Sequence, residues 1–355
     1  MVKIGNMLYT NKLYREDLKN IIEDNNFELL MNSSILVTGA SGMIGSVIID
    51  TLLLSNELLN LNIKIFALSR DKKSLIHRFK SNINNPLFSL IVNDINTPLN
   101  TSYNFDYIIH AASNAYPKAF SIDPVGTIMT NINGVNNLLN YGKNHNIKRF
   151  LFVSSGEVYG QAKENIAAFE EDYSGYVNPI NPRSCYPNGK RAAETLCISY
   201  RSQYDLDTVI ARPCHTFGPS ATAKDNRAAS QFIQRITQDK DIIMKSDGLQ
   251  LRSYIYVSDC VSALFSILLN GECGKAYNVA NKNSNVTIRE IAQQLANSSN
   301  KKIIFENPSD KERDSFNPIS KSVLDSTKLE SLGWKARYNV RDALNRTVSI
   351  LKQIL

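Results

Sequence analysis

The sequence predicts an α/β fold in which a doubly wound parallel sheet is joined by a smaller, partly interleaved C-terminal lobe. From residue 35 onward, short apolar runs rich in β-branched residues alternate with segments whose apolar residues have helical spacing. This alternation is typical of parallel strands that are covered by helices on both faces. A glycine-rich turn joins the first apolar run to the first helical segment, and after about residue 213 the apolar runs become shorter.

The predicted elements alternate between strand and helix through most of the chain. Strands are expected at 34–38, 64–68, 88–92, 107–110, 149–154 and 208–212. Helices are expected at 45–56, 126–144, 190–204, 229–239 and 258–269. Right-handed crossovers between parallel strands place such helices on both faces of the sheet, which is a Rossmann-type arrangement.

The glycine-rich turn is the strongest local signal. Gly39 can adopt the tight turn, Gly42 lets the backbone approach a phosphate, and Gly45 lets the helix pack close to the strand. Backbone N–H groups at such a helix N-terminus bind a pyrophosphate, so a dinucleotide site is expected, with a bare connector turn as the alternative. The residues expected to contact the dinucleotide are Thr38, Gly39, Ser41, Gly42, Met43, Ile44 and Gly45.

The chain is expected to divide into three segments. Residues 1–31 form an N-terminal helical extension, because Leu13, Leu18 and Ile21 have helical spacing among acidic residues. This helix should pack on the domain edge or on a partner subunit. Residues 32–212 form the dinucleotide-binding Rossmann domain, and residues 213–355 mainly form a substrate-binding lobe.

The residues that follow the second and third strands indicate the cofactor. The second strand ends in Ser69-Arg70, where Arg70 can pair with a 2′-phosphate and Ser69 can donate to it. This favours NADP over NAD, with a solvated charge run as the alternative. Asp94 and Ile95 follow the third strand and are placed to contact the adenine, with a plain turn acid as the alternative.

Tyr186 and Lys190 begin a predicted helix and lie four residues apart, on one face. An ammonium beside a phenol stabilises the tyrosinate and lowers the pKa of the phenol from about 10 toward neutrality. Such a tyrosine can take a proton from an alcohol while a serine hydroxyl opposite holds the same oxygen. Tyr-x-x-x-Lys pairs are frequent by chance, so this pair alone identifies nothing.

Several further motifs occur in a fixed order along the chain and make the Tyr186–Lys190 pair informative. These are the glycine turn 38–45, His110-Ala111-Ala112, residues 131–134, residues 154–160, Tyr186 with Lys190, residues 211–213, Gly218-Pro219 and residues 247–259. Together they resemble the extended short-chain dehydrogenase/reductases, specifically the nucleotide-sugar epimerases, dehydratases and decarboxylases. The resemblance extends from residue 35 to about residue 344.

The resemblance implies roles for particular residues. Catalysis would be carried by Ser155, Tyr186 and Lys190, with Lys190 also binding the cofactor. Ala111, Ala112 and Ser113 would line the cofactor, and Asn131 would buttress the active-site helix. The substrate would be bound by Tyr116 and His215 near the sugar or phosphate, and by Arg252 at the nucleotide diphosphate. Asp259 would brace the helix that follows it.

Glu157 helps to distinguish which reaction the enzyme would catalyse. In the resembling 4,6-dehydratases an acid pair precedes Val-Tyr-Gly, and the Glu removes the C5 proton of a 4-keto sugar. Here Glu157 follows Gly156. This favours dehydratase or decarboxylase chemistry with Glu157 as a catalytic residue. A surface carboxylate is the alternative for Glu157. A 4-epimerase, an NADPH-dependent 4-ketosugar reductase and a non-catalytic dinucleotide-binding sensor or scaffold also remain open.

Composition limits the partners. The 355 residues carry a net charge of +7, but the basic residues are dispersed, so no nucleic acid is expected. No apolar run reaches the ~18 residues that span a bilayer, and no signal peptide is evident, so a cytoplasmic enzyme without a membrane partner is expected. The five cysteines and four histidines have no metal-ligand spacing, so no metal is expected. The resemblance, rather than composition, implies a nucleotide-diphosphate sugar as substrate and a homodimer formed through helices 126–144 and 190–204.

Overall fold

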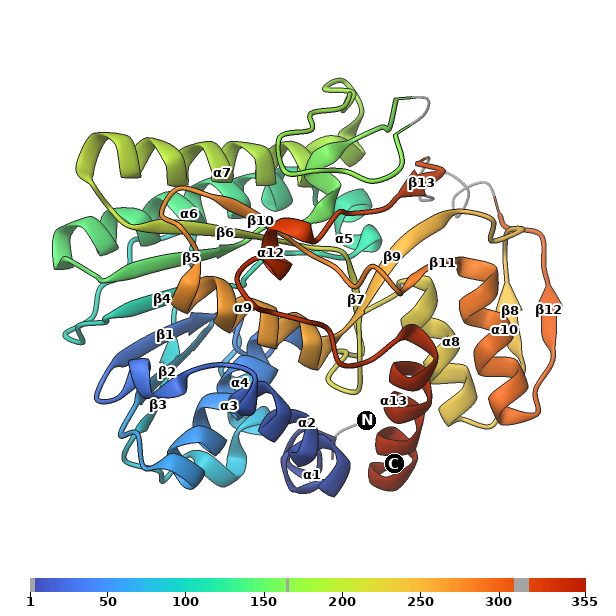
Figure 1. The fold of residues 1–355 in the computed structure, drawn as a ribbon, viewed down its shortest axis with the longest axis horizontal. Helices are drawn as coiled ribbons and strands as arrows, with labels where there is room; N and C mark the ends of the chain where they lie inside the picture. The colour runs from blue at the N-terminus through green and yellow to red at the C-terminus, as the bar shows by residue number, and fades with distance from the viewer. Residues whose placement is uncertain (1–3, 164–165, 310–318) are drawn as a thin grey trace.

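The computed structural model describes residues 4–163, 166–309 and 319–355, so residues 1–3 of the expected N-terminal extension and 310–318 of the C-terminal lobe lie outside it. A parallel sheet with the strand order β10-β6-β5-β4-β1-β2-β3 forms the centre of the molecule (Figure 1). Its strands are β1 Ser34–Thr38, β2 Lys64–Ser69, β3 Phe88–Val92, β4 Tyr107–His110, β5 Arg149–Val153, β6 Thr208–Pro213 and β10 Ala276–Val279. The predicted fold class is confirmed, and each strand predicted from the sequence is present within one residue at its ends.

Alternating residues of the strands face two separate cores. Ile35 and Val37 of β1 pack in a core with α3 Met43–Leu59 and α9 Val257–Asn270, whereas Leu36 packs on the opposite face. The opposite face is covered by α6 Pro124–His145 and α7 Cys185–Tyr204, which lie along each other (Figure 1). Since both faces of every central strand are buried, the strands are continuously apolar rather than alternating in polarity.

A smaller lobe follows β6. One of its sheets consists of β7 His215–Phe217, β9 Leu251–Tyr256, β11 Asn285–Thr287 and β13 Lys321–Ser322. In a second sheet, β8 Ile242–Met244 pairs with β12 Ile303–Phe305. Its helices are α8 Ala228–Thr237, α10 Ile288–Ser299 and α13 Val340–Ile354. Between them, α9 and β10 return to the central sheet. The segment after residue 213 is therefore interleaved with the first domain.

The remaining helical elements are short. They are α1 Ile4–Thr10, α2 Lys12–Glu23, η1 Phe27–Leu30, α4 Lys72–Arg78, η2 Lys80–Asn82, α5 Pro117–Ile122, η3 Gly156–Tyr159, η4 Pro182–Ser184 and α12 Thr327–Glu330. Among the residues that the structure describes, no helix combines the length and the apolarity needed to cross a bilayer.

The N-terminal extension joins distant parts of the chain. The carboxylate of Asp17 on α2 is buried and accepts hydrogen bonds from the hydroxyls of Tyr256 (2.7 Å) and Tyr338 (2.9 Å) and from Nε of Arg346 (2.6 Å). Tyr14 on the same helix donates to Asp50 of α3 at 2.7 Å. The helix expected from its apolar spacing thus packs on its own chain, between α3, α9 and α13.

Candidate active site

The glycine turn between β1 and α3 has the geometry of a phosphate cradle. Gly39 has a φ of +67°, and a Cβ there would lie 2.7 Å from the Ala111 carbonyl oxygen. The N–H of Gly42 donates to the Gly39 carbonyl at 2.8 Å, and Gly42 caps α3 without a side chain. A Cβ at Gly45 would lie 2.3 Å from the Gly39 carbonyl oxygen. Since the chain leaves no space for a side chain at Gly39 or Gly45, and the first turn of α3 has no side-chain cap from Gly42, these residues fit a dinucleotide pyrophosphate.

The end of β4 is tied to this turn. Thr38 Oγ1 lies 2.6 Å from His110 Nδ1 and accepts a hydrogen bond from the Ala112 N–H at 3.3 Å. Ser113 donates to Asn131 Oδ1 at 3.0 Å, and Asn131 donates to the Thr127 carbonyl at 2.8 Å. The residues expected to line the cofactor after β4 therefore lie beside the glycine turn, and Asn131 links that segment to α6.

The other two expected cofactor segments lie at the carboxyl ends of β2 and β3. Ser69 ends β2, and Arg70 beyond it is exposed. Asp71 caps α4 by accepting from the N–H groups of Lys73 and Ser74, which fixes the turn that carries Arg70. Asp94 Oδ1 accepts from the Asn96 N–H at 2.9 Å. Because the carboxyl ends of parallel strands all lie at the same end of the sheet, these segments lie at the same end of the sheet as the glycine turn.

The candidate catalytic side chains meet at the start of α7 and the end of β5. Tyr186 and Lys190 are buried on one face of α7, and Lys190 Nζ lies 5.8 Å from the centre of the Tyr186 ring. The ammonium donates to the Val153 carbonyl at 2.8 Å. The Ser155 side chain is close enough to Tyr186 to lower the pKa of the phenol. The fold therefore brings together the Tyr186 and Lys190 side chains predicted from their spacing and the Ser155 side chain implied by the resemblance.

Burial changes the expected protonation of this pair. It raises the pKa of Tyr186 above its usual range, and the charge of Glu157 raises it further, while Ser155 and Arg227 act in the opposite direction. Burial also lowers the pKa of Lys190 to about 7, against the opposing charge of Glu194. The expected lowering of the phenol pKa by Lys190 is thus absent from this state of the protein. The residue spacing indicated the ammonium but not the cost of burying both charges.

Glu157 forms an ion pair that the sequence did not predict. Both of its carboxylate oxygens lie 3.3 Å from guanidinium nitrogens of Arg183, and each side chain is about one-fifth exposed. Arg183 lies on η4, three residues before Tyr186, and its Cζ is 5.7 Å from the centre of the Phe120 ring. Phe120 in turn stacks on Tyr186 at 4.7 Å. The only sequence signal for Arg183 was its position just before the Tyr-x-x-x-Lys pair.

The expected substrate residues come from three different elements. Tyr116 caps α5 and packs in the cluster that contains Phe120 and Tyr186. Arg252 on β9 is buried and donates to the carbonyls of Leu251 (3.0 Å) and Ile319.

His215 on β7 is expected to contact the substrate as well. Its ring lies 5.5 Å from that of Tyr254. Burial and the charges of Arg252, Arg227 and Arg183 lower the pKa of His215 to about 3, so its imidazole is neutral. Of the three arginines that lower the pKa of His215, Arg227 is, like Arg183, one that the sequence did not indicate.

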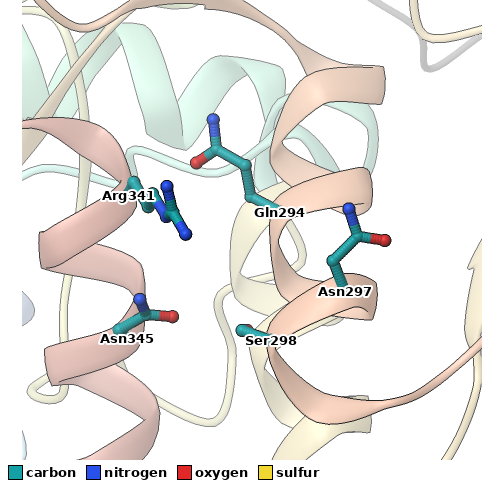
Figure 2. A pocket seen from close by; sticks show the side chains of 5 residues that line it. All are labelled: Gln294, Asn297, Ser298, Arg341 and Asn345. Atoms are coloured by element: carbon teal, nitrogen blue, oxygen red, sulfur yellow. The ribbon is translucent and has the colours of Figure 1, made fainter.

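Two cavities lie outside these residues. One of about 510 Å³ is bordered by Arg212 of β6 and by Glu194 and Arg191 of α7. The other, of about 390 Å³, lies between α10 and α13, where Gln294, Arg341 and Asn345 point into the space between the helices (Figure 2). Neither cavity is lined by any residue predicted to bind cofactor or substrate.

Comparison with known proteins agrees with this fold and arrangement. Residues 35–280 match the NAD dependent epimerase/dehydratase family. The chain is 35% identical to UDP-glucuronic acid decarboxylase 3 of Arabidopsis thaliana over 88% of this chain and 87% of that protein. It is 32% identical to UDP-glucuronic acid decarboxylase 1 of Xenopus tropicalis over 90% of this chain and 72% of the relative.

Solved structures share the fold at lower identity. UDP-glucuronic acid 4-epimerase of Bacillus cereus, in complex with UDP-glucuronic acid and NAD, superposes with a TM-score of 0.75 at 23% identity, covering 91% of this chain and 100% of that one. The dTDP-glucose 4,6-dehydratase of Bacillus anthracis, in complex with NAD, gives a TM-score of 0.74 at 21% identity, covering 90% and 97%.

The fold and the glycine turn define an NAD(P)-dependent enzyme of the Rossmann class. The chain belongs to the NAD dependent epimerase/dehydratase family, as the resemblance of its motifs implied.

Proposed function

We propose that the protein decarboxylates a nucleotide-activated uronic acid, of which UDP-glucuronic acid is the first candidate. The observation that carries this proposal is the 35% identity to a UDP-glucuronic acid decarboxylase over nearly the full length of both chains. The grouping of Ser155, Tyr186, Lys190 and Glu157 supports an enzyme rather than a sensor or scaffold, since dinucleotide binding alone does not need these side chains.

In the proposed reaction, Tyr186 takes the proton of the C4 hydroxyl while Ser155 hydrogen-bonds the same oxygen. The glycine turn and the ends of β2, β3 and β4 would hold NAD(P), which would accept the hydride from C4. The resulting ketone lies β to the C6 carboxylate, so the electrons of the C5–C6 bond pass to the C4 oxygen as CO₂ leaves. The enolate is then protonated at C5, and the hydride removed from C4 would be returned to it, so that the sugar loses CO₂ without net oxidation. We assign this protonation to Glu157.

The charges around Tyr186 suit an anionic substrate. The guanidinium groups of Arg183, Arg227 and Arg252 act on this region, where Glu157 and Asp225 are the carboxylates paired with them. One positive charge is therefore left uncompensated within this set. A nucleotide diphosphate with a uronic acid carboxylate is well matched to that excess.

The test is to incubate the purified protein with UDP-glucuronic acid, UDP-glucose and dTDP-glucose, with NAD⁺ and separately with NADP⁺, and to identify products by mass spectrometry. Loss of CO₂ from UDP-glucuronic acid is the expected result. Loss of water would instead indicate a dehydratase, and a product of unchanged mass would indicate an epimerase. Consumption of NADPH with a 4-keto sugar alone would indicate a reductase. No turnover with tight dinucleotide binding would indicate a sensor.

We also propose that Arg70 binds a 2′-phosphate and gives a preference for NADP. Arg70 is exposed directly after β2, on a turn fixed by the Asp71 cap. An enzyme that recycles its cofactor within one reaction needs no 2′-phosphate, and the solved neighbours quoted above contain NAD. Titration of the protein with each dinucleotide by calorimetry decides between the two.

We further propose a homodimer in which α6 and α7 pack against the same helices of a second copy. Val125 and Met129 of α6 are 71% and 42% exposed, and Ile198 of α7 is 38% exposed. Light scattering after size-exclusion chromatography should give the dimer mass. Met129→Glu should give the monomer mass, and an unchanged mass would place the interface elsewhere.

A further inference from the structure

The ion pair between Arg183 and Glu157 is placed beside the candidate catalytic phenol. Its two parallel contacts, both 3.3 Å, fix the carboxylate in orientation as well as in distance. The two residues come from separate segments, η3 after β5 and η4 before α7. The pair therefore connects the segment that carries Ser155 to the helix that carries Tyr186.

Arg183 and Tyr186 also share an aromatic neighbour. The guanidinium carbon of Arg183 lies 5.7 Å from the centre of the Phe120 ring, and the rings of Phe120 and Tyr186 are stacked at 4.7 Å with an angle of 20°. Side chains packed against a common ring have little freedom to move independently. The geometry of the ion pair is therefore tied to the position of the phenol.

Several charged groups act on this phenol. Glu157 on η3 disfavours the tyrosinate, whereas the Ser155 hydrogen bond and Arg227, which precedes α8, favour it. Lys190 lies on the same helix, with its ammonium 5.8 Å from the ring centre. Glu157 itself is influenced by Arg183 and, from β9, by Arg252. Glu157 is the only one of the groups named here that opposes ionisation of Tyr186.

We propose that Arg183 is a positioning residue that fixes Glu157 and neutralises its charge beside the Tyr186 phenol. The carboxylate is then held in the site without suppressing formation of the tyrosinate that takes the proton from the substrate. This proposal rests on the role given to Tyr186 in the proposed function, but on no particular substrate. Arg183 would be required for ionisation of the base rather than for contact with the reacting atoms.

The test uses 3,5-difluorotyrosine placed at position 186 of the full chain and titrated by ¹⁹F NMR in the presence of saturating NAD⁺. Fluorination makes the phenol more acidic, which brings its titration into the accessible range, and the label gives one resonance without any substrate. Arg183→Gln should move the midpoint upward by about one pH unit, because it leaves the charge of Glu157 unpaired. Adding Glu157→Gln should return the midpoint to that of the parent. Arg183→Lys keeps the charge and should shift the midpoint less.

Arg149→Gln is the matched control. Arg149 makes the same kind of pair with Asp207, at 3.0 Å and 2.8 Å, at the opposite end of β5. This variant should leave the midpoint unchanged. A midpoint unmoved by Arg183→Gln, or a shift that Glu157→Gln does not reverse, overturns the proposal.

Kinetics supply a second readout. If UDP-glucuronic acid is turned over, the acid limb of the pH–rate profile should move upward in Arg183→Gln by the same amount as the NMR midpoint. A rise in KM with an unmoved acid limb would mean that Arg183 binds substrate directly, and it would overturn the proposal. Midpoints that shift as expected in a protein that turns over no nucleotide sugar would support the role of Arg183 while refuting the proposed function.

Discussion

Gly45 and Gly42 are constrained in different ways, so substitutions there can separate packing from cofactor binding. A Cβ at Gly45 would lie 2.3 Å from the Gly39 carbonyl oxygen, a backbone atom that cannot rotate away. A Cβ at Gly42 would lie 3.1 Å from the same oxygen, a contact that a shift of a few tenths of an ångström relieves. We therefore expect Gly45→Ala to destabilise the fold and Gly42→Ala mainly to obstruct a phosphate.

The size of the Gly45→Ala effect follows from two opposing contributions. Overpacking against an immobile neighbour costs about 1–3 kcal/mol. Gly45 lies inside α3, so alanine recovers about 0.5–1 kcal/mol of helix propensity. At the middle of both ranges, the free energy of unfolding should fall by about 1 kcal/mol, measured by urea denaturation. Gly142→Ala in α6 is the control, since its Cβ would meet side-chain atoms rather than backbone: Ile147 Cδ1 at 2.6 Å, Ile147 Cγ1 at 3.2 Å and Leu206 Cδ1 at 3.7 Å.

Calorimetric titration with NAD⁺ and NADP⁺ completes the comparison. Gly42→Ala should weaken dinucleotide binding at least tenfold, about 1.4 kcal/mol, while its unfolding midpoint stays close to that of the parent. Parental stability of Gly45→Ala would refute the reasoning about the close contact. Parental dinucleotide affinity of Gly42→Ala would remove the glycine turn from the cofactor site.

Three further predictions concern the base, the cofactor and pH. Tyr186→Phe should abolish turnover and preserve the fold and dinucleotide binding; a rate within roughly tenfold of the parent, about 1.4 kcal/mol, would remove the phenol from the mechanism. Arg70→Asp should shift calorimetric preference from NADP toward NAD, and an unchanged preference would mean that the ribose is read elsewhere. Burial raises the pKa of Asp259 from 3.8 to about 7, so the native state binds the extra proton and stability should fall as pH rises between these values. Asp259→Asn should flatten this part of the profile, and an equally steep profile would assign the pH dependence to another group.

The central fold could be predicted because each strand carried its own signal. The strands β1 to β6 are apolar runs bounded by polar residues, and the helices between them have clear apolar spacing. By contrast, β10 is only four residues long and contains Asn278, so its sequence resembles a connector. It joins the sheet because Asn278 is satisfied internally, accepting from Tyr159 at 2.5 Å and donating to the Phe169 and Asp325 carbonyls. Those partners are distant in sequence and could not be identified from it.

The candidate site was predictable only as far as its motifs extend. Ser155, Tyr186 and Lys190 belong to ordered motifs, whereas Arg183 and Arg227 lie in segments without one. Their relevance comes from electrostatic contact with Glu157 and Tyr186 across the fold. The predicted lowering of the pKa of the Tyr186 phenol was wrong for a related reason. Residue spacing gives the sign of a neighbouring charge but not the extent of burial, and burial is the largest influence on the pKa of Tyr186 and raises it.

Gly156 gives a packing reason to favour decarboxylation over dehydration. The resembling dehydratases use an acid beside the residue equivalent to Glu157, and here that position is a buried glycine. A Cβ at Gly156 would lie 3.1 Å from Leu324 Cδ1 and 3.5 Å from the Pro213 carbonyl oxygen. Leu324 is itself buried in the cluster with Val158. A carboxylate there would have to displace an apolar side chain and lose its hydration, at a cost of several kcal/mol. A second acid at position 156 would therefore require Leu324 to move, whereas departure of CO₂ requires no second acid.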